Sequence, residues 1–263
     1  MNKRFNSAIK VWMFIVYGII FLPILVIIMM SFNKTNYGYL PFEFTFEWYK
    51  YLFTRSDLLP ATFLSLKLAG GVAVTSIGVG TLTALGVQKF PKKLAELFNS
   101  IVQLPIIIPW LVQGIAMLLL FNFTGLGRSF TGMFFGNLIV VLPYVIMMVV
   151  GRFAGLDRTP EDAARMLGAK PPRVFFDVTL PELVPGILSG GLMAFMVCFN
   201  AFCMQYYLAP FGVNTLPMEI FTLVRTGYEA DLNALATILI LTTTAIVLLL
   251  NKLGYSARKM FSI

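Results

Sequence analysis

Long, mostly apolar runs without charge dominate the chain, and short segments that hold lysine, arginine, aspartate or glutamate separate them. A bilayer core of about 30 Å is crossed by a helix of about 20 mostly apolar residues. The pattern therefore predicts an all-α, polytopic membrane protein with about six transmembrane helices. The predicted spans are Ile9 to Phe32, Phe63 to Val87, Ile101 to Phe123, Met133 to Phe153, Leu183 to Ala209, and Leu232 to Leu253.

The composition agrees with this reading. Hydrophobic residues make up 58% of the 263 residues and charged residues only 12%, whereas soluble domains carry about one quarter charged residues. The first run contains Pro23, and no small-residue cleavage site follows it, so we interpret it as a retained span rather than a secretory signal. All connections are shorter than an independent domain, which predicts a single membrane domain over residues 1–263.

Lysine and arginine lie mainly in alternate connections, which sets the expected orientation because positive charge stays on the cytoplasmic side. The richer set is Lys3, Arg4, Lys10, Lys89, Lys92, Lys93, Arg152, Arg158, Arg165, Lys170, Arg173, Lys252, Arg258 and Lys259. The opposite set is Lys34, Lys50, Arg55, Arg128 and Arg225. Both termini are therefore predicted to be cytoplasmic. The net charge of +8 is largely this asymmetry, which indicates contact with anionic membrane lipid rather than nucleic acid.

Several kinds of chemistry are disfavoured by residues that the sequence lacks. It contains no histidine, and its two cysteines, Cys198 and Cys203, do not have CxxC spacing. A metal site or a histidine-based catalyst is therefore not expected. No GxxxxGK[ST] string is present, so we expect no phosphate-binding loop for ATP. These observations predict a chain without catalytic residues, bound metal or a cofactor of its own.

The segment from Asn33 to Pro60, on the predicted outer side, is rich in aromatic side chains. They are Phe42, Phe44, Phe46, Trp48, Tyr49 and Tyr51. Aromatic rings concentrate at the bilayer interface. We therefore favour an interfacial anchor with a short amphipathic helix over a ligand site.

Prolines interrupt several spans, and each removes a backbone donor that neighbouring protein or a water-filled cavity must replace. The stretch from Gln103 to Trp110 contains two of them and is a candidate for the wall of a translocation pathway. Polar or amphipathic side chains in the third and fifth spans are the candidate pathway residues: Gln103, Trp110, Gln113, Asn200, Gln205 and Tyr206. Interhelical hydrogen bonding is the alternative role for each of them.

The connection between the fourth and fifth spans, residues 154–182, has strong helix signals. Thr159 precedes a proline and two acids, which predicts a capped helix from Pro160 to Leu167. Gly168 is expected to end this helix in a left-handed conformation. A second short helix is predicted from Pro172 to about Val178, so the loop is a compact helix-turn-helix on the cytoplasmic side.

This loop resembles the EAA loop of the permease subunits of binding-protein-dependent ABC importers. The family pattern is EAA, three residues, Gly, nine residues, Ile, one residue and Leu-Pro. The matching residues here are Asp162, Ala163, Ala164, Gly168, Val178, Leu180 and Pro181. Aspartate replaces glutamate and valine replaces isoleucine, and both changes are conservative. The resemblance implies an ATPase-coupling loop made by Glu161, Asp162, Ala163, Ala164, Arg165, Gly168, Leu180 and Pro181.

The same resemblance implies the assembly in which the chain works. A multi-pass permease domain of the inner membrane forms half of the translocation pathway, and a second, related but non-identical permease forms the other half. An extracytoplasmic binding protein delivers the solute. A cytoplasmic ATPase dimer uses ATP and Mg, and its closure moves the membrane helices through the coupling loop.

Two further stretches are similar to spermidine/putrescine-type permeases: Asn214 to Ile240, and PILVIIMMSFNKTNYG followed by FTFEWYKYLF. The expected solute is therefore a polyamine or a related organic cation. Asn200 departs from that pattern, because polyamine permeases usually hold acidic residues in this region and a neutral amide alone does not compensate a buried cation. Iron, thiamine, phosphonate or an amino-acid derivative are the alternatives. An ion-coupled secondary carrier is a further alternative. Such carriers usually need acidic residues or histidines within the membrane, and the predicted spans offer almost none, with Lys67 as the conspicuous ionisable exception.

Overall fold

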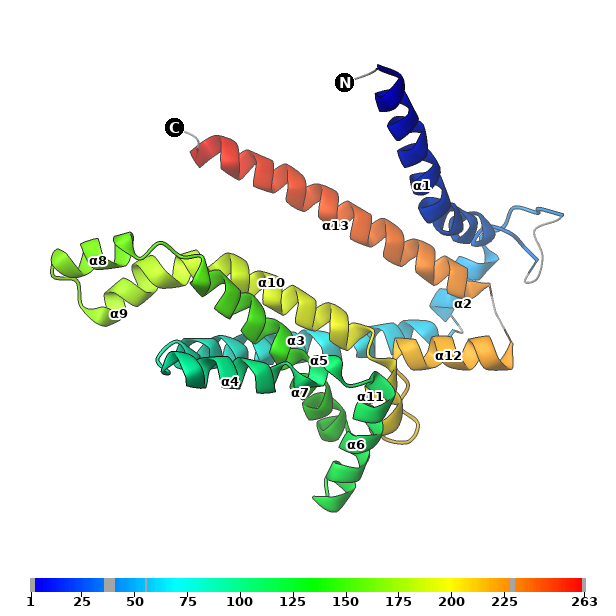
Figure 1. Cartoon of the computed structure of the whole chain (residues 1–263). Coiled ribbons are helices and arrows are strands. Elements are labelled where there is room, and N and C mark those ends of the chain that lie inside the picture. Colours follow the sequence, from blue (N-terminus) through cyan, green and yellow to red (C-terminus); the bar gives the residue numbers. More distant parts are fainter. Residues whose placement is uncertain (1–2, 36–40, 55, 228–229, 262–263) are drawn as a thin grey trace. The chain divides into compact units, whose positions relative to one another are not determined.

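The computed structural model describes residues 3–35, 41–54, 56–227 and 230–261 (Figure 1). Apart from one isolated β-bridge between Asn33 and Phe44, its regular elements there are helices. In order they are α1 (Lys3–Met30), α2 (Glu47–Thr54), α3 (Leu58–Val87), α4 (Lys92–Val102), α5 (Leu104–Ile107), α6 (Trp110–Phe123), α7 (Phe130–Ala154), α8 (Thr159–Met166), α9 (Pro171–Val174), the π-helix η1 (Phe175–Thr179), α10 (Leu180–Phe199), α11 (Phe202–Leu208), α12 (Leu216–Thr226) and α13 (Asp231–Phe261). The predicted all-α class is confirmed.

In the described residues, five helices are long and apolar enough to cross a membrane, or six if one bent pair counts as a span. They are Ile9–Met30, Leu58–Val87, Phe130–Ala154, Pro171–Phe199 and Asp231–Leu249, with Lys92–Ile107 and Trp110–Phe123 as the bent pair. The prediction of about six spans is therefore confirmed. The predicted orientation stays a prediction. Arg55 lies outside the described residues, and the structure describes only the backbone of Lys3, Arg4, Arg258 and Lys259.

The third span is not the single helix that was predicted from Ile101 to Phe123. The chain bends by 103° between Ile107 and Trp110. Ile108 is extended, with φ −72° and ψ 132°, because a proline disfavours the helical conformation of the residue before it. The bend thus lies at the second proline of the stretch, Pro109.

The fifth span also differs from its prediction of Leu183 to Ala209. Its helical segment starts at Pro171 and ends at Phe199, and α11 follows as a separate short helix. Prolines were expected to interrupt several spans, and Pro185 is the one within the predicted fifth span, but it lies inside α10 and does not interrupt it. A helical proline leaves the carbonyl four residues earlier without a donor. Here that carbonyl belongs to Pro181, an exposed residue at the polar end of the helix.

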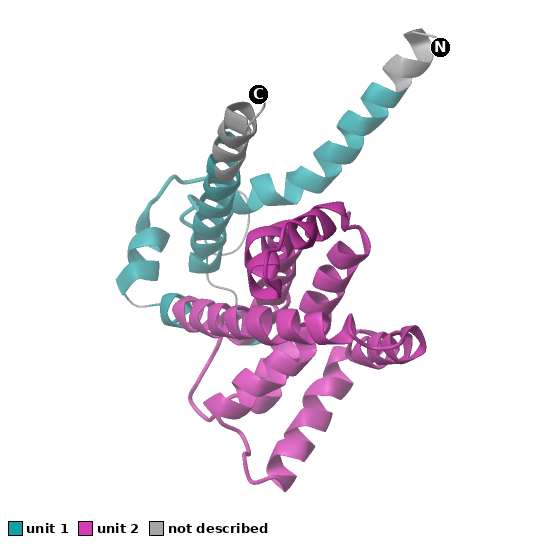
Figure 2. Ribbon diagram, turned by 90° about the vertical axis from the view of Figure 1, so that its left-hand side faces the viewer, with its two compact units in different colours: residues 1–60, 219–263 teal, residues 61–218 magenta. Residues whose placement is uncertain are grey.

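The described chain packs as two compact units (Figure 2). Unit 1 comprises residues 1–60 and 219–263, and unit 2 comprises residues 61–218. The prediction of a single membrane domain stays a prediction. All candidate coupling and pathway residues belong to unit 2.

Close backbone contacts join three helices in unit 2. A Cβ atom on Gly190 of α10 would lie 3.0 Å from Val145 Cα of α7. A Cβ atom on Gly80 of α3 would lie 2.8 Å from Val145 Cγ1. Small residues allow such approach, and van der Waals packing is what drives association of helices in lipid. The fully buried Val145 is therefore a central contact of this core.

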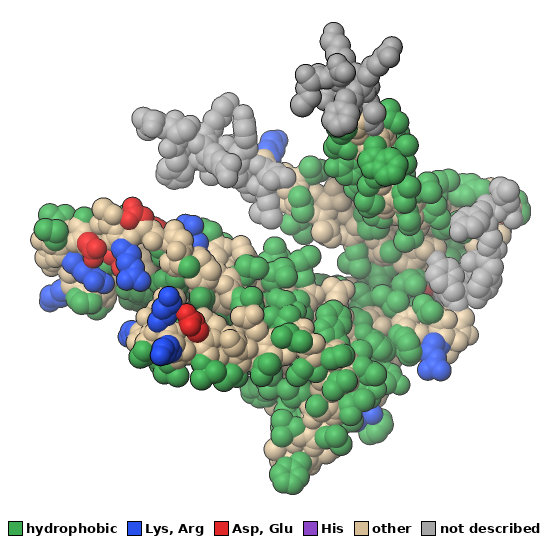
Figure 3. Space-filling view, viewed as in Figure 1, with side chains coloured by type: hydrophobic (Ala, Val, Ile, Leu, Met, Phe, Trp, Pro, Cys, Tyr) green, Lys and Arg blue, Asp and Glu red, His purple; other side chains and the backbone are tan. Residues whose placement is uncertain are grey.

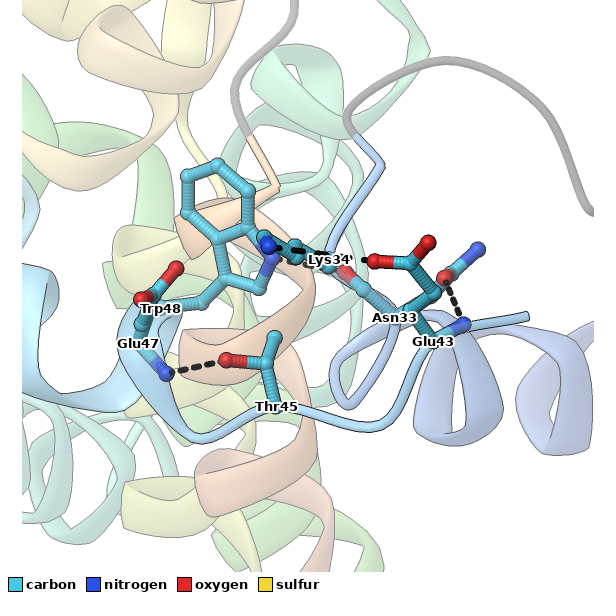
Figure 4. A network of polar contacts seen from close by, with 6 residues as sticks. All are labelled: Asn33, Lys34, Glu43, Thr45, Glu47 and Trp48. Carbon is cyan, nitrogen blue, oxygen red and sulfur yellow. Dashed lines mark hydrogen bonds and ion pairs between the residues drawn. The ribbon is translucent and has the colours of Figure 1, made fainter. Parts of the chain in front are cut away.

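In unit 1, the segment from Glu43 to Trp48 folds back on the residues after α1 through polar contacts (Figure 4). Trp48 Nε1 donates to the carbonyl of Asn33 at 2.7 Å, and the Glu43 amide donates to Asn33 Oδ1 at 3.1 Å. Phe32 and Phe44 stack with ring centroids 5.5 Å apart. The helix predicted here is α2. The interfacial-anchor role stays a prediction.

Candidate functional site: a coupling loop and two broken helices

Charged side chains of unit 2 gather at one end, over α8, α9 and the beginning of α4 (Figure 3). The exposed basic residues of these segments are Lys92, Lys93, Arg158, Arg165, Lys170 and Arg173. Two connections that are distant in sequence therefore share one polar end. This agrees with their assignment to one side of the membrane from charge alone.

The first helix of the loop, α8, lacks the predicted Thr159 cap; its N-cap residue is Arg158, which makes no side-chain cap hydrogen bond. Asp157 Oδ1 accepts from the Thr159 amide at 3.0 Å and from Thr159 Oγ1 at 2.7 Å. The side-chain hydrogen bond from Thr159, and secondly its backbone hydrogen bond, lower the pKa of the Asp157 carboxyl below its usual value. The predicted capping hydroxyl is thus a donor to Asp157, because an ionised carboxylate is the stronger acceptor.

Gly168 ends α8 as predicted, with a φ of +82° that favours glycine. The second helix of the loop differs from the prediction of Pro172 to Val178. It begins at Pro171 and continues through η1 into α10 without leaving helical geometry. The loop is therefore a short helix, a sharp turn and the extension of a membrane span.

Most of the predicted coupling residues lie on the surface of this loop. Asp162, Ala163, Arg165, Gly168 and Pro181 are exposed, while Ala164 and Leu180 are half-buried. Glu161 points inward, toward the base of α10, and its side chain is 21% exposed.

The tip of α8 carries two apolar side chains that sequence reasoning missed. Met166 is 89% exposed and Leu167 is 88% exposed. At the polar end of unit 2 such side chains have unfavourable contact with water unless another surface covers them. Their signal in the sequence was an apolar pair directly before the helix-ending glycine.

Gln113, a predicted pathway residue on α6, lies at the bend of the third span. Its Nε2 atom donates to the carbonyls of Pro105 and Ile108, the latter at 3.0 Å. The side chain is 7% exposed. One amide thus supplies donors to carbonyls at the end of α5 that have lost a helical partner.

Gln205, another predicted pathway residue, lies at the break in the fifth span. Its Nε2 atom donates to the carbonyl of Cys198 at 2.7 Å, across the non-helical Asn200 and Ala201. Gln205 is fully buried, and its Oε1 atom has no hydrogen-bond partner. Both breaks in unit 2 are therefore bridged by a buried glutamine.

The two broken spans meet where α6 packs against α11. A Cβ atom on Gly114 would lie 2.8 Å from the Tyr207 ring and 3.0 Å from the Cys203 carbonyl oxygen. A cavity of about 10 Å³ lies beside this contact, which is about the room that one water molecule needs. Its lining residues are Trp110, Gln113, Val140, Val197, Ala201, Cys203 and Met204. No solute fits inside this cavity.

The other pathway candidates do not line that cavity. Gln103 is half-buried between α4 and α5. Asn200 is exposed, and its Nδ2 atom donates to the Met196 carbonyl at 2.9 Å within its own helix end. Tyr206 is 44% exposed. The structure therefore places Trp110 and Gln113 of α6 beside α11, the helix that carries Gln205. It does not bring all six candidates into one site.

Arg128 is a positioning residue that sequence reasoning treated only as an outside charge. Its Nε atom donates to the carbonyl of Ala209 at 3.0 Å and Nη2 donates to that of Tyr206 at 3.3 Å. Its guanidinium carbon lies 4.7 Å from the centroid of the Phe211 ring. A positive side chain is favourable at the carboxyl end of a helix, so Arg128 fixes the carboxyl end of α11.

Comparison with known proteins identifies relatives over most of the chain. The family described as "Binding-protein-dependent transport system inner membrane component" matches residues 76–262. The spermidine/putrescine transport system permease protein PotC of Haemophilus influenzae is 30% identical over 238 residues, which are 90% of this chain and 93% of that protein. The putrescine transport system permease protein PotI of Escherichia coli K12 is 29% identical over 85% of this chain and 82% of that protein.

A molybdenum transport system permease protein, ModB of Mycobacterium bovis, is 32% identical over 75% of this chain and 80% of that protein. Among solved structures, a bacterial ABC transporter involved in the import of the acidic polysaccharide alginate has a chain that matches with a TM-score of 0.70. That match covers 99% of this chain and 97% of the other at 16% identity. The methionine ABC transporter MetNI gives a TM-score of 0.56 over 77% of this chain and 98% of the other, also at 16% identity. These two likenesses show the fold.

Proposed function

This chain belongs to the inner membrane components of binding-protein-dependent transport systems, and we propose that it forms half of the pathway for a polyamine or a related organic cation. It is a permease subunit of an ABC importer in the inner membrane. The polyamine proposal is supported by the two relatives of spermidine and putrescine transport systems, which match 85 to 90% of the chain.

ATP hydrolysis is assigned to partner subunits, which use ATP and Mg and dock at α8. The observation that carries this assignment is the exposed tip of α8 beyond the membrane helices, where Met166 and Leu167 are almost fully uncovered. Exposed small residues beside them, such as Ala163, allow the helix to seat closely in a groove of the partner. An apolar anchor surrounded by polar contacts is the usual composition of such an interface.

Co-purification tests the docking. Ala163→Trp and Leu167→Ser in the affinity-tagged chain should each reduce the ATPase recovered with it, because one blocks close seating and the other removes the apolar anchor. Leu97→Ser is the control, since Leu97 is an exposed leucine, at 57%, on a different helix, α4. Equal ATPase recovery with all three variants and the unchanged chain would contradict docking at α8.

The remaining partners are a second, non-identical permease chain and an extracytoplasmic binding protein. The small cavity beside α6 and α11 supports a pathway that one chain does not enclose alone. Asn200 supplies no carboxylate, so selection of a cation is assigned chiefly to the binding protein and to the second permease chain. Mass measurement of the intact purified complex tests the composition, and two identical permease chains would contradict it.

Uptake of labelled solutes tests the substrate class. Cells that lack this chain should lose high-affinity uptake of spermidine or putrescine, and the purified binding protein should bind the same amine. Molybdate is the comparison solute because one relative belongs to a molybdenum transport system. Unchanged polyamine uptake with lost molybdate uptake would refute the polyamine assignment and leave the permease assignment intact.

A further inference from the structure

One acidic side chain of α8 turns away from the surface that a partner would meet. Glu161 Oε1 accepts a hydrogen bond of 2.5 Å from Thr179 Oγ1 in η1. Glu161 Oε2 lies 3.8 Å from Arg165 Nη2, so both carboxylate oxygens have partners inside this chain. The Glu161 side chain is 21% exposed and that of Arg165 is 61% exposed. Glu161 therefore joins two parts of the loop rather than presenting its charge to another protein.

The hydroxyl group of Thr179 is used differently from those of other helical threonines. Six of them donate to the carbonyl four residues earlier in their own helix: Thr54, Thr75, Thr83, Thr226, Thr237 and Thr243. This local bond is the usual choice for threonine in a helix. Thr179 is buried and donates instead to α8, across 18 residues of sequence. It lies in a π-helical turn, a distortion that is frequent at functional sites.

From Thr179 the chain continues directly into the membrane core of unit 2. Leu180, with φ −62° and ψ −46°, joins η1 to α10 in ordinary helical geometry. Seven residues from Thr179, Gly186 meets α7, where a Cβ atom would lie 2.8 Å from Arg152 Cβ. Arg152 Nε also donates to the Glu182 carbonyl at 2.8 Å. No break separates Thr179 from the packed pair of α7 and α10.

The covalent route from α8 to α10 is softer. It passes through the turn at residues 167–170, where Leu167, Gly168 and Lys170 are exposed. A force on α8 could bend this turn without moving the span. The hydrogen bond between Glu161 and Thr179 bypasses the turn, because it joins the first turn of α8 to the base of α10.

We propose that Glu161 and Thr179 form a strut that transmits displacement of α8 to α10 and α7 during transport. Glu161 is then a positioning residue of the coupling loop rather than a contact of the ATPase. This inference rests on the proposed docking of the ATPase at α8. A rigid connection between a docking site and packed helices is the physical requirement for coupling two distant sites.

The test compares uptake with ATP hydrolysis in the complete reconstituted transporter. Thr179→Val removes the hydroxyl at nearly constant volume, and Glu161→Ala removes the acceptor. Both should retain the ATPase and its hydrolysis, while solute transported per ATP falls by about threefold or more. Thr179→Ser keeps the hydroxyl and should transport as much solute per ATP as the unchanged chain. The double variant should fall no further than Glu161→Ala alone, since that variant already lacks the contact with Thr179.

Thr83→Val is the matched control, because the Thr83 hydroxyl bonds only its own helix, to the Val79 carbonyl at 2.7 Å. Ratios like that of the unchanged chain in both Thr179→Val and Glu161→Ala would overturn the strut. Losses that multiply in the double variant would also overturn it. If Glu161→Ala does not fold, the pair Thr179→Val and Thr179→Ser decides the question. Failure of the unchanged chain to retain the ATPase would instead contradict the docking proposal.

Discussion

Unit 2 contains two interrupted membrane helices, and each interruption is bridged by a buried glutamine, but only one of them is marked by a proline. The break between Ile107 and Trp110 contains Pro109, and Gln113 donates hydrogen bonds to two carbonyls there. The break at Asn200 has no proline, and its Gln205 serves one carbonyl while its own Oε1 atom has no partner. The second break therefore needs a cause outside its local sequence.

That cause is the packing of α11. Gln205, in the middle of α11, is bonded back to α10, and Arg128 holds the carbonyls of Tyr206 and Ala209. Two residues before Gln205, the backbone of Cys203 lies against Gly114 of α6. In lipid, a freed backbone group is tolerated only where protein supplies a partner. The comparison teaches that a proline begins one break, whereas tertiary contacts alone maintain the other.

The largest expected effect comes from filling the contact between the two broken spans. Gly114→Val would place a Cβ atom 3.0 Å from the backbone oxygen of Cys203, which does not move aside as a side chain can. We expect a loss of roughly 3 kcal/mol in the free energy of unfolding. The measurement is a lower thermal midpoint of unfolding for the purified chain in detergent. Gly78→Val is the control, since no atom lies within 4 Å of its Cβ position. Equal midpoints would mean that α6 and α11 do not pack here.

The next effect concerns the proline-marked break. Gln113→Leu keeps the volume but leaves the carbonyls of Pro105 and Ile108 without a side-chain donor. Burial of unsatisfied polar groups should cost about 2 kcal/mol. The same thermal midpoint measures it, and amide exchange of residues 104–113 should rise.

A smaller loss is expected at the break without proline. Gln205→Leu removes the donor to Cys198, but it also removes the buried Oε1 atom that has no partner. The two changes partly cancel, which leaves a cost of about 1 kcal/mol. A Gln205 variant that is less stable than the Gln113 variant would reverse the comparison.

The smallest effect is expected at the proline itself. Pro109 is exposed, with φ −56° and ψ 135°, a conformation that alanine adopts without strain. Pro109→Ala should therefore change the stability by no more than about 0.5 kcal/mol. The bend should persist because Gln113 still bridges it, and unchanged amide exchange of residues 106–113 would show this. A straightened, fully protected helix there would mean that proline alone maintains the break.

The coupling loop was predictable in outline. The spacing from Asp162 to Pro181 located it, and the glycine at 168 marked the end of α8. The contacts at the start of α8 were not predictable, because Thr159 and Asp157 both favour helix starts and only the backbone direction makes Thr159 a donor to Asp157. The inward turn of Glu161 was also hidden, since Thr179 is 18 residues away.

By itself, the sequence determined the number and limits of most spans and their separation by charged connections. It could do so because the lipid environment acts on each residue according to its own polarity. The tertiary structure alone decided where α10 ends and which carbonyl each glutamine serves. It also decided that Arg128 holds a helix end 81 residues away. Such contacts depend on distances between helices, and the pattern of residues along one helix does not contain them.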